Sequence, residues 1–178
     1  MCRDFDLNNF RKIRSDYDNG LGDYIFITLK KMLTDQVIIR DAQMDDVWEL
    51  TALMTDLGYP TTPEEFRIRF ANISAHPDYR TIVAVTNGEI VGFAGLQKNI
   101  FYEYNGNYLR ILAFVVKKNA RKLGIGKILI EAAEAWAKAQ GLHTAVISSG
   151  NRAERDAAHA FYQKMSYAVK SSGFVKKL

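Results

Sequence analysis

A basic stretch with two glycines, at residues 115–127, constrains this chain more than any other feature. It begins with the apolar pair Val115 and Val116 and then carries five Lys or Arg side chains, with no acidic residue among its thirteen positions. Behind it, apolar residues recur at helical spacing, which predicts a helix that begins near Gly124 and ends just before Gly141. We therefore expect a strand, a basic turn and a helix in succession.

The start of that helix is suited to binding an anion. The first N–H groups of a helix have no partner within it, and the aligned peptide dipoles leave about half a positive charge at that end. Gly124 and Gly126 lack side chains that would keep an anion from the backbone, and Arg121, Lys122 and Lys127 add full positive charges. The ligand favoured by this combination is a phosphate or pyrophosphate.

Two common phosphate motifs do not fit the spacing. The P-loop requires a glycine where this chain has Arg121, and a Ser or Thr where it has Ile128. The dinucleotide fingerprint requires a third glycine where Leu129 stands. What remains, Arg-x-x-Gly-x-Gly between a strand and a helix, resembles the acetyl-CoA pyrophosphate motif of the GNAT superfamily of N-acetyltransferases. The alternative is an ordinary basic loop.

Composition limits the remaining possibilities. A chain of 178 residues with 48% hydrophobic content fits one globular domain with a sizeable core. Its one cysteine, Cys2, cannot form an internal disulfide, and no Cys/His cluster has metal-ligand spacing, so we expect no metal. No apolar run suggests a membrane span or a signal peptide, which predicts a soluble, cytoplasmic protein. A net charge of +4 does not by itself indicate nucleic acid as a partner.

The first 36 residues differ from the rest of the chain. Residues 1–23 are rich in Asp and Asn and show no sustained period, which is typical of weakly ordered chain. Residues 24–29 have strand character, and a natural start at Met32 is an alternative hypothesis. We therefore expect an N-terminal extension at 1–36, weakly ordered or accessory, and one domain at 37–178.

Within that domain, helix and strand signals alternate. Thr62, Pro63 and Glu65 predict a capped helix start, Gly58 predicts a helix end, and Asn87-Gly88 predicts a hairpin. We expect an α/β (α+β) fold whose mixed, mostly antiparallel sheet has about six to seven strands, flanked by about four helices. The strands are expected at 37–40, 81–86, 90–96, 108–116, 143–148, 167–170 and 173–176, and the helices at 47–57, 63–73, 124–140 and 157–165.

A second motif supports the resemblance. Residues 158–167 are similar to the family's Ala-x-x-Phe-Tyr-x-x-x-Gly-Tyr helix and strand, and the predicted order of elements is that of the GNAT fold, over roughly Val37 to Leu178. The resemblance implies acetyl-CoA as co-substrate. It also implies that the backbone of Phe114, Val115 and Val116 pairs with the pantetheine arm. Further implied cofactor contacts are Arg121, Lys122, Leu123, Gly124, Ile125, Gly126, Lys127 and Asn151.

Acetyl transfer to an amine requires a neutral amine, stabilisation of an oxyanion and a proton for the leaving thiolate. The resemblance implies that Tyr162 lies beside the thioester sulfur and supplies that proton as general acid. Many family members carry a glutamate base where this chain has Arg110. The base therefore stays unassigned, with Glu103, Tyr108 or an acid of the early helices as candidates. Since Cys2 lies outside the domain, we expect direct transfer within a ternary complex.

Two further positions depart from the family pattern. Lys122 stands where a glycine usually follows the arginine, which keeps positive charge and reduces backbone freedom. Ser166 replaces the glycine before Tyr167, which predicts a different turn there. His143 and His159 are interpreted as packing or surface histidines.

The acceptor is the least constrained part of the prediction. Between Arg40 and Arg67 the chain carries seven acids and no base, which is typical of a solvated face and also favours a site for a cationic amine. A polyamine, an aminoglycoside or an amino-acid derivative fits that site. A protein lysine or N-terminus, or a non-catalytic acyl-CoA-binding regulatory domain, is the alternative. The resemblance also allows a homodimer.

Overall fold

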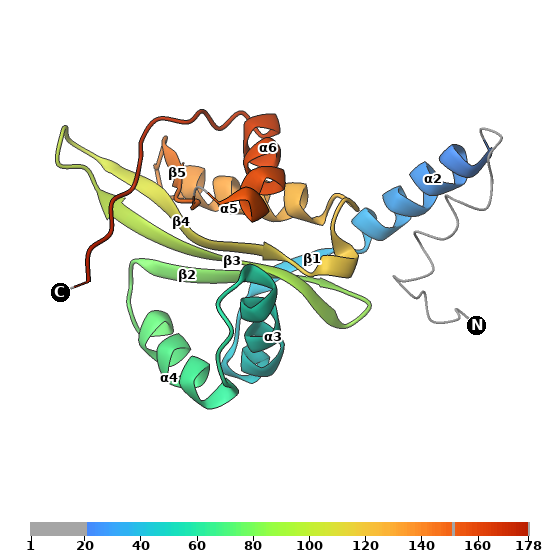
Figure 1. Ribbon diagram of the computed structural model, residues 1–178, viewed down its shortest axis with the longest axis horizontal. Coiled ribbons are helices and arrows are strands. Elements are labelled where there is room, and N and C mark those ends of the chain that lie inside the picture. The colour runs from blue at the N-terminus through green and yellow to red at the C-terminus, as the bar shows by residue number, and fades with distance from the viewer. Residues whose placement is uncertain (1–20, 151, 178) are drawn as a thin grey trace.

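A five-stranded sheet forms the centre of the computed structural model, which describes residues 21–150 and 152–177 (Figure 1). The strands lie side by side in chain order, the first four antiparallel and the last parallel to its neighbour. The predicted hairpin at Asn87-Gly88 joins the second and third strands. In order, the strands are β1 (Ile38–Asp41), β2 (Tyr79–Thr86), β3 (Glu89–Ile100), β4 (Asn107–Val116) and β5 (Ala145–Ile147).

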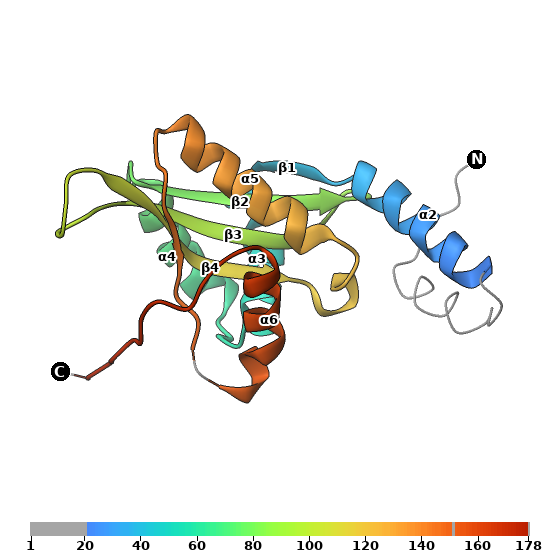
Figure 2. The ribbon, with the colours of Figure 1, turned by 90° about the horizontal axis from the view of Figure 1, so that it is seen from above.

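Helices cover both faces of the sheet (Figures 1 and 2). On one face lie α3 (Val47–Leu57), which follows the short η1 (Met44–Asp46), and α4 (Pro63–Ser74). On the other lie α5 (Ile125–Ala139) and α6 (Asp156–Lys164), which follow η2 (Lys118–Ala120) and η3 (Ala153–Arg155). The predicted capping box of α4 is confirmed, because Thr62 and Glu65 each accept the other's backbone N–H. The predicted end of α3 at Gly58, with φ of 96°, is confirmed as well.

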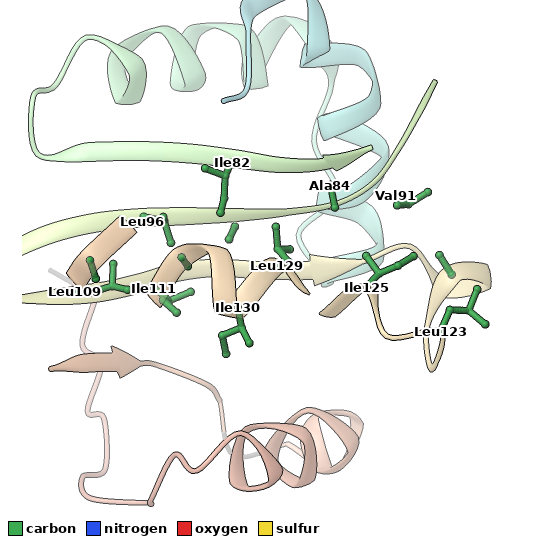
Figure 3. Packing of buried hydrophobic residues seen from close by; sticks show 14 of the residues in the cluster. Ile82, Ala84, Val91, Leu96, Leu109, Ile111, Leu123, Ile125, Leu129 and Ile130 are labelled. Atoms are coloured by element: carbon green, nitrogen blue, oxygen red, sulfur yellow. The ribbon is translucent and has the colours of Figure 1, made fainter. Parts of the chain in front are cut away.

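The sheet separates two apolar clusters. The first packs the apolar face of α5 on the sheet, as its helical spacing predicts (Figure 3). The second packs α3 and α4 on the opposite face. Side chains of the first include Ile82, Leu96, Leu109, Ile111, Ile125, Leu129 and Ile130, and side chains of the second include Val47, Leu50, Phe66, Phe70, Val83, Phe93 and Val115.

A β-bulge divides β4. Ile111 pairs with Leu96 and Ala113 pairs with Gly95, so Leu112 is an extra residue without a partner of its own on β3. Because side chains alternate between faces along a strand, one extra residue exchanges the two faces. Ile111 packs toward α5, whereas Ala113 packs toward α3 and α4.

The prediction of strand character at residues 24–29 is wrong. These residues lie within a helix, α2 (Leu21–Asp35), that leads into β1. A short apolar run does not distinguish strand from helix, and this one continues into Lys30 and Lys31 without a turn residue. Residues 1–20 lie outside the described part of the chain, and the domain boundary at residue 36 stays a prediction.

The predicted closing hairpin is also wrong. Residues 168–177 contain no strand, and Val169, Phe174 and Val175 are 82%, 96% and 97% exposed. A hairpin needs a sheet or an apolar face to pack against, and this segment buries none of these three side chains. The described sheet therefore has five strands where six to seven were expected.

Three helices end in the same left-handed turn, at Gly58, Gly141 and Ser166. In α6 the N–H of Ser166 donates to Gln163 O at 2.9 Å and that of Tyr167 donates to Tyr162 O at 2.9 Å, the two bonds of a Schellman motif. The expectation of a different turn at Ser166 is therefore wrong, because serine adopts a φ of 67° where glycine is usual. The cost is backbone strain.

We expect Ser166→Gly to stabilise the protein by about 1 kcal/mol, because the left-handed strain of a non-glycine residue outweighs the entropy lost by glycine. Chemical unfolding measures this change, and Tm should rise by about 2–4 °C. Gly141→Ser is the matched control at the same turn of α5, where an added Cβ meets nothing within 4 Å. It should cost a similar amount, and a stabilising Gly141→Ser would contradict the explanation.

Candidate active site

The second half of β4 has a free edge. β4 pairs with β5 only at Leu109, Arg110 and Ile111, whereas its pairing with β3 continues to Val116. In the described part of the chain, residues 113–116 therefore have no strand on their β5 side. A free edge presents backbone N–H and C=O groups that an extended ligand can pair with, as an added strand would.

The side chains along this edge have separate roles. Val115 is buried in the cluster beneath α3 and α4, so its side chain is closed to a ligand. Phe114 faces the opposite way and packs against Phe161 and Tyr162 of α6, with ring centroids 5.9 and 6.1 Å away. The edge of β4 and α6 thus lie beside each other.

The basic turn joins this edge to α5. Lys122 and Gly124 both have positive φ, 68° and 97°, and Gly124 is the N-cap of α5. The side chains of Leu123 and Ile125 are buried in the core, so they can offer only backbone to a ligand. On the surface lie the charges of Arg121, Lys122 and Lys127, the last with an ion pair of 3.8 Å to Glu131.

Polar contacts fix the turn to the end of α3. Arg121 Nε donates to Val116 O at 2.9 Å, and its terminal nitrogen lies 3.4 Å from Asp56 O. The Asp56 carboxylate accepts the N–H of Lys118 at 3.1 Å and pairs with Lys118 Nζ at 3.4 Å. Arg155 donates to Leu57 O at 2.6 Å. These carbonyls lack partners inside α3 because they end the helix.

Tyr162 lies in an aromatic setting. Its ring is 5.7 Å from that of Phe161 and 6.4 Å from that of Tyr167. Phe161 rests on Gly126, where an added Cβ would lie 3.4 Å from the Phe161 ring. Burial raises the pKa of Tyr162, and the nearby positive charge of Arg155 opposes that shift more weakly. The Tyr162 hydroxyl is therefore a weaker acid than an exposed tyrosine.

Two polar contacts hold α6 in place. Tyr167 donates from its hydroxyl to Glu134 of α5 at 3.0 Å, and burial together with this carboxylate raises the pKa of Tyr167 well above its usual value. His159 lies 3.1 Å from Ser149 Oγ, which agrees with its interpretation as a packing residue. These contacts connect α6 to α5 and to the loop after β5.

The base candidates fall into two groups, Glu103 and Tyr108 on the β3–β4 hairpin and the acids that precede β2. Arg110 cannot act as a base because guanidinium stays protonated, and its buried Nε has no hydrogen-bond partner among the described residues. Glu103 and Tyr108 line a hollow at the tip of the β3–β4 hairpin. Of the early acids, Asp41, Asp46, Asp56 and Glu65 already serve structural contacts, with Arg80, Arg40, Lys118 and the α4 cap.

Reasoning from the sequence missed Asp56 and Arg155. Asp56 was one of seven similar acids, and its partner Lys118 is 62 residues away, so no local pattern marks it. Asn151, a predicted cofactor contact, lies outside the described residues. Within the described ranges, no three His, Cys, Asp or Glu side chains gather as a metal site, and no helix is long and apolar enough to span a membrane.

Comparison with known proteins shows the family of this chain. Residues 44–167 match the model of the Acetyltransferase (GNAT) family, and the chain belongs to that family. It is an acetyl-CoA-dependent N-acetyltransferase.

The chain is similar to several individual acetyltransferases. An aminoglycoside N(6')-acetyltransferase type 1 from Klebsiella aerogenes is 36% identical over 110 residues, which are 58% of this chain and 72% of that protein. A GNAT family acetyltransferase from Staphylococcus aureus has a crystal structure with a TM-score of 0.69 and 34% identity, over 80% of this chain and 99% of that one. The aminoglycoside N-acetyltransferase AAC(6')-Iy in complex with CoA shares the fold, with a TM-score of 0.71 and 15% identity over 80% and 94% of the two chains.

We expect Arg121→Lys to raise the Kd for CoA about three- to tenfold, because lysine keeps the charge but cannot reproduce the forked contacts to Val116 and Asp56. Calorimetric titration with CoA measures this change. Lys138→Arg, at the exposed last turn of α5, is the control and should bind as the wild type does. Equal affinity of Arg121→Lys and wild type would show that the contacts do not shape the turn.

Proposed function

We propose that this enzyme acetylates a primary amine of a small cationic acceptor of the aminoglycoside or polyamine type, by direct attack within a ternary complex. The observation that carries the proposal is the free edge of β4 at residues 113–116, flanked by the basic turn and by Tyr162. The relationship to an aminoglycoside N(6')-acetyltransferase supports the acceptor class.

The proposed cofactor site combines the edge of β4 with the basic turn. The backbone of residues 114–116 pairs with the amide-containing arm of acetyl-CoA, and the first N–H groups of α5 with Arg121, Lys122 and Lys127 hold its phosphates. These assignments fit because no strand pairs with that side of residues 113–116 among the described residues, where Val116 O accepts only from Arg121 Nε, and because the three charged side chains reach the surface. Acetyl-CoA supplies the activated acetyl group.

In the proposed transfer a C–N bond forms, the C–S bond breaks, CoA leaves as its thiolate and the amine nitrogen loses a proton to solvent. A backbone N–H of the β4 edge stabilises the oxyanion, and Tyr162 hydrogen-bonds the departing sulfur. A thiol has a pKa of about 8.5 and an ordinary tyrosine about 10, so complete proton transfer is uphill by about 2 kcal/mol or more. Burial increases this difference, so we assign Tyr162 to stabilising the sulfur by hydrogen bonding as its charge grows.

Arg110 stands where many family members carry a glutamate base, and its charge suggests a different way to favour a neutral amine. It lies two residues before the bulge, and its terminal nitrogen is 3.4 Å from Ser148 Oγ. A cation beside the reacting amine lowers the pKa of that amine and so increases its neutral fraction. We propose that this effect replaces part of the work of a carboxylate base.

A thiol-release assay tests the function, with acetyl-CoA and a panel of aminoglycosides, polyamines, amino acids and lysine peptides. We expect turnover on one polycationic class. Tyr162→Phe should lower kcat about 10²-fold while CoA binding persists, because it removes only the hydrogen bond to the developing charge on sulfur. Tyr59→Phe, at an exposed tyrosine, is the control. Turnover confined to lysine peptides, or tight binding without turnover, would refute the proposal.

The raised pKa of Tyr162 gives a pH prediction. Burial disfavours the phenolate, so the hydroxyl stays protonated to higher pH than in an exposed tyrosine. We expect kcat of the wild type to show no tyrosine-dependent decline below about pH 10. The check is a pH–rate profile compared with that of Tyr162→Phe. A decline near pH 8 to 9 that vanishes in the variant would contradict it.

A further inference from the structure

A hollow of about 440 Å³ opens at the tip of the β3–β4 hairpin, outside the cofactor site. The hollow is open to solvent, so it can cover one end of a ligand but not enclose a whole small molecule. Six lining residues belong to the hairpin and one to β5: Ile100, Phe101, Tyr102, Glu103, Tyr104, Tyr108 and Val146. Because Val146 of β5 contributes to the lining, the hollow is formed by the sheet as well as by the hairpin loop.

The hollow is aromatic. The ring of Phe101 lies 4.3 Å from that of Tyr104 and 4.5 Å from that of Tyr108, at interplanar angles of 38° and 31°. Tyr104 is 60% exposed and Tyr102 is fully exposed. Solvent-facing tyrosines present electron-rich ring faces, which attract an ammonium or guanidinium group.

The charge of the hollow is negative. Glu103 is its one charged lining residue, and in the described part of the chain it makes no ion pair. The nearby guanidinium of Arg110 contacts Ser148, which follows Ile147, the partner of Ile111. Arg110 is thus turned toward the bulge and away from the hairpin tip. The hollow therefore combines aromatic rings with one carboxylate, which together fit a cation.

We propose that this hollow binds a remote ammonium group of an elongated, polyamine-like acceptor whose reacting amine lies at the bulge. The inference rests on the proposed function and adds the spacing of charges in the substrate. From Tyr108 to Leu112 is four residues, or about 13 Å at the usual rise of a strand. The acceptor therefore has two amines at least about that far apart, since Glu103 lies beyond Tyr108 toward the hairpin tip. Arg110, between them, favours the neutral form of the reacting amine while Glu103 holds the charged one.

The test compares α,ω-diamines of increasing length at saturating acetyl-CoA. We expect kcat/KM to rise at least tenfold from short diamines to those that span the distance. Tyr104→Leu should remove at least fivefold of that gain, with short diamines and the KM for acetyl-CoA unchanged. Glu103→Gln should lower kcat/KM at least fivefold more on the longest diamine than on the short ones. Glu154→Gln, at another exposed acid, should behave as the wild type does. A kcat/KM independent of length, or an equal loss on short and long diamines, would overturn the proposal.

A binding measurement separates this proposal from the proposed function. Calorimetric titration of the CoA-bound protein with the longest diamine should give affinity in the wild type and at least fivefold weaker affinity in Glu103→Gln. If no amine is acetylated yet this difference is present, the hollow binds a cation and the proposed function fails. If transfer occurs and the difference is absent, the hollow is not a cation site. A change from dimer to monomer in Tyr104→Leu would instead assign the hollow to a second copy of the chain.

Discussion

The extra residue at Leu112 marks the point where β4 changes from a strand paired on both sides to a strand with one free edge. A continuous ladder between β4 and β5 would satisfy the backbone of residues 113–116 and leave nothing for a ligand to pair with. The bulge exchanges the faces of β4, and the pairing with β5 ends at Ile111. One half of the strand thus belongs to the sheet on both sides, and the other half keeps an edge free among the described elements. The free edge, the basic turn and α6 are arranged around that division.

The side of the domain that carries α6 is held by few contacts. No side chain of α6 is fully buried, whereas α5 buries five. α6 is positioned by the seat of Phe161 on Gly126, by the bond from Tyr167 to Glu134 and by that from Arg155 to Leu57 O. Elements with little buried apolar surface open at low free energy, as ligand-binding elements commonly do. The core beneath α5 supplies the stability that α6 does not.

Features that depend on residues close together in the sequence were predicted correctly. The cap at Thr62, the Asn87-Gly88 hairpin and the apolar face of α5 follow from turn chemistry and period, and all are observed. The features that were predicted wrongly or missed depend on contacts that are distant in the sequence or on the length of an apolar run. The apolar run at residues 24–29 was too short to distinguish helix from strand, and the C-terminal hairpin had no surface to pair with. The bulge at Leu112 and the contact of Asp56 with Lys118 depend on distant partners, which sequence spacing does not reveal.

The position of α2 has a thermodynamic consequence. A methyl group added at Gly124 would lie 3.0 Å from Thr34 Cγ2 and 3.6 Å from Lys30 Cε, so α2 lies against the N-cap of α5. Coupling between two sites is reciprocal: whatever free energy a ligand of that turn gains or loses from α2, the helix gains or loses from the ligand. Any contact that a ligand of the turn makes with Thr34 or Lys30 would therefore couple its binding to the stability of α2, which lies outside the family match at 44–167.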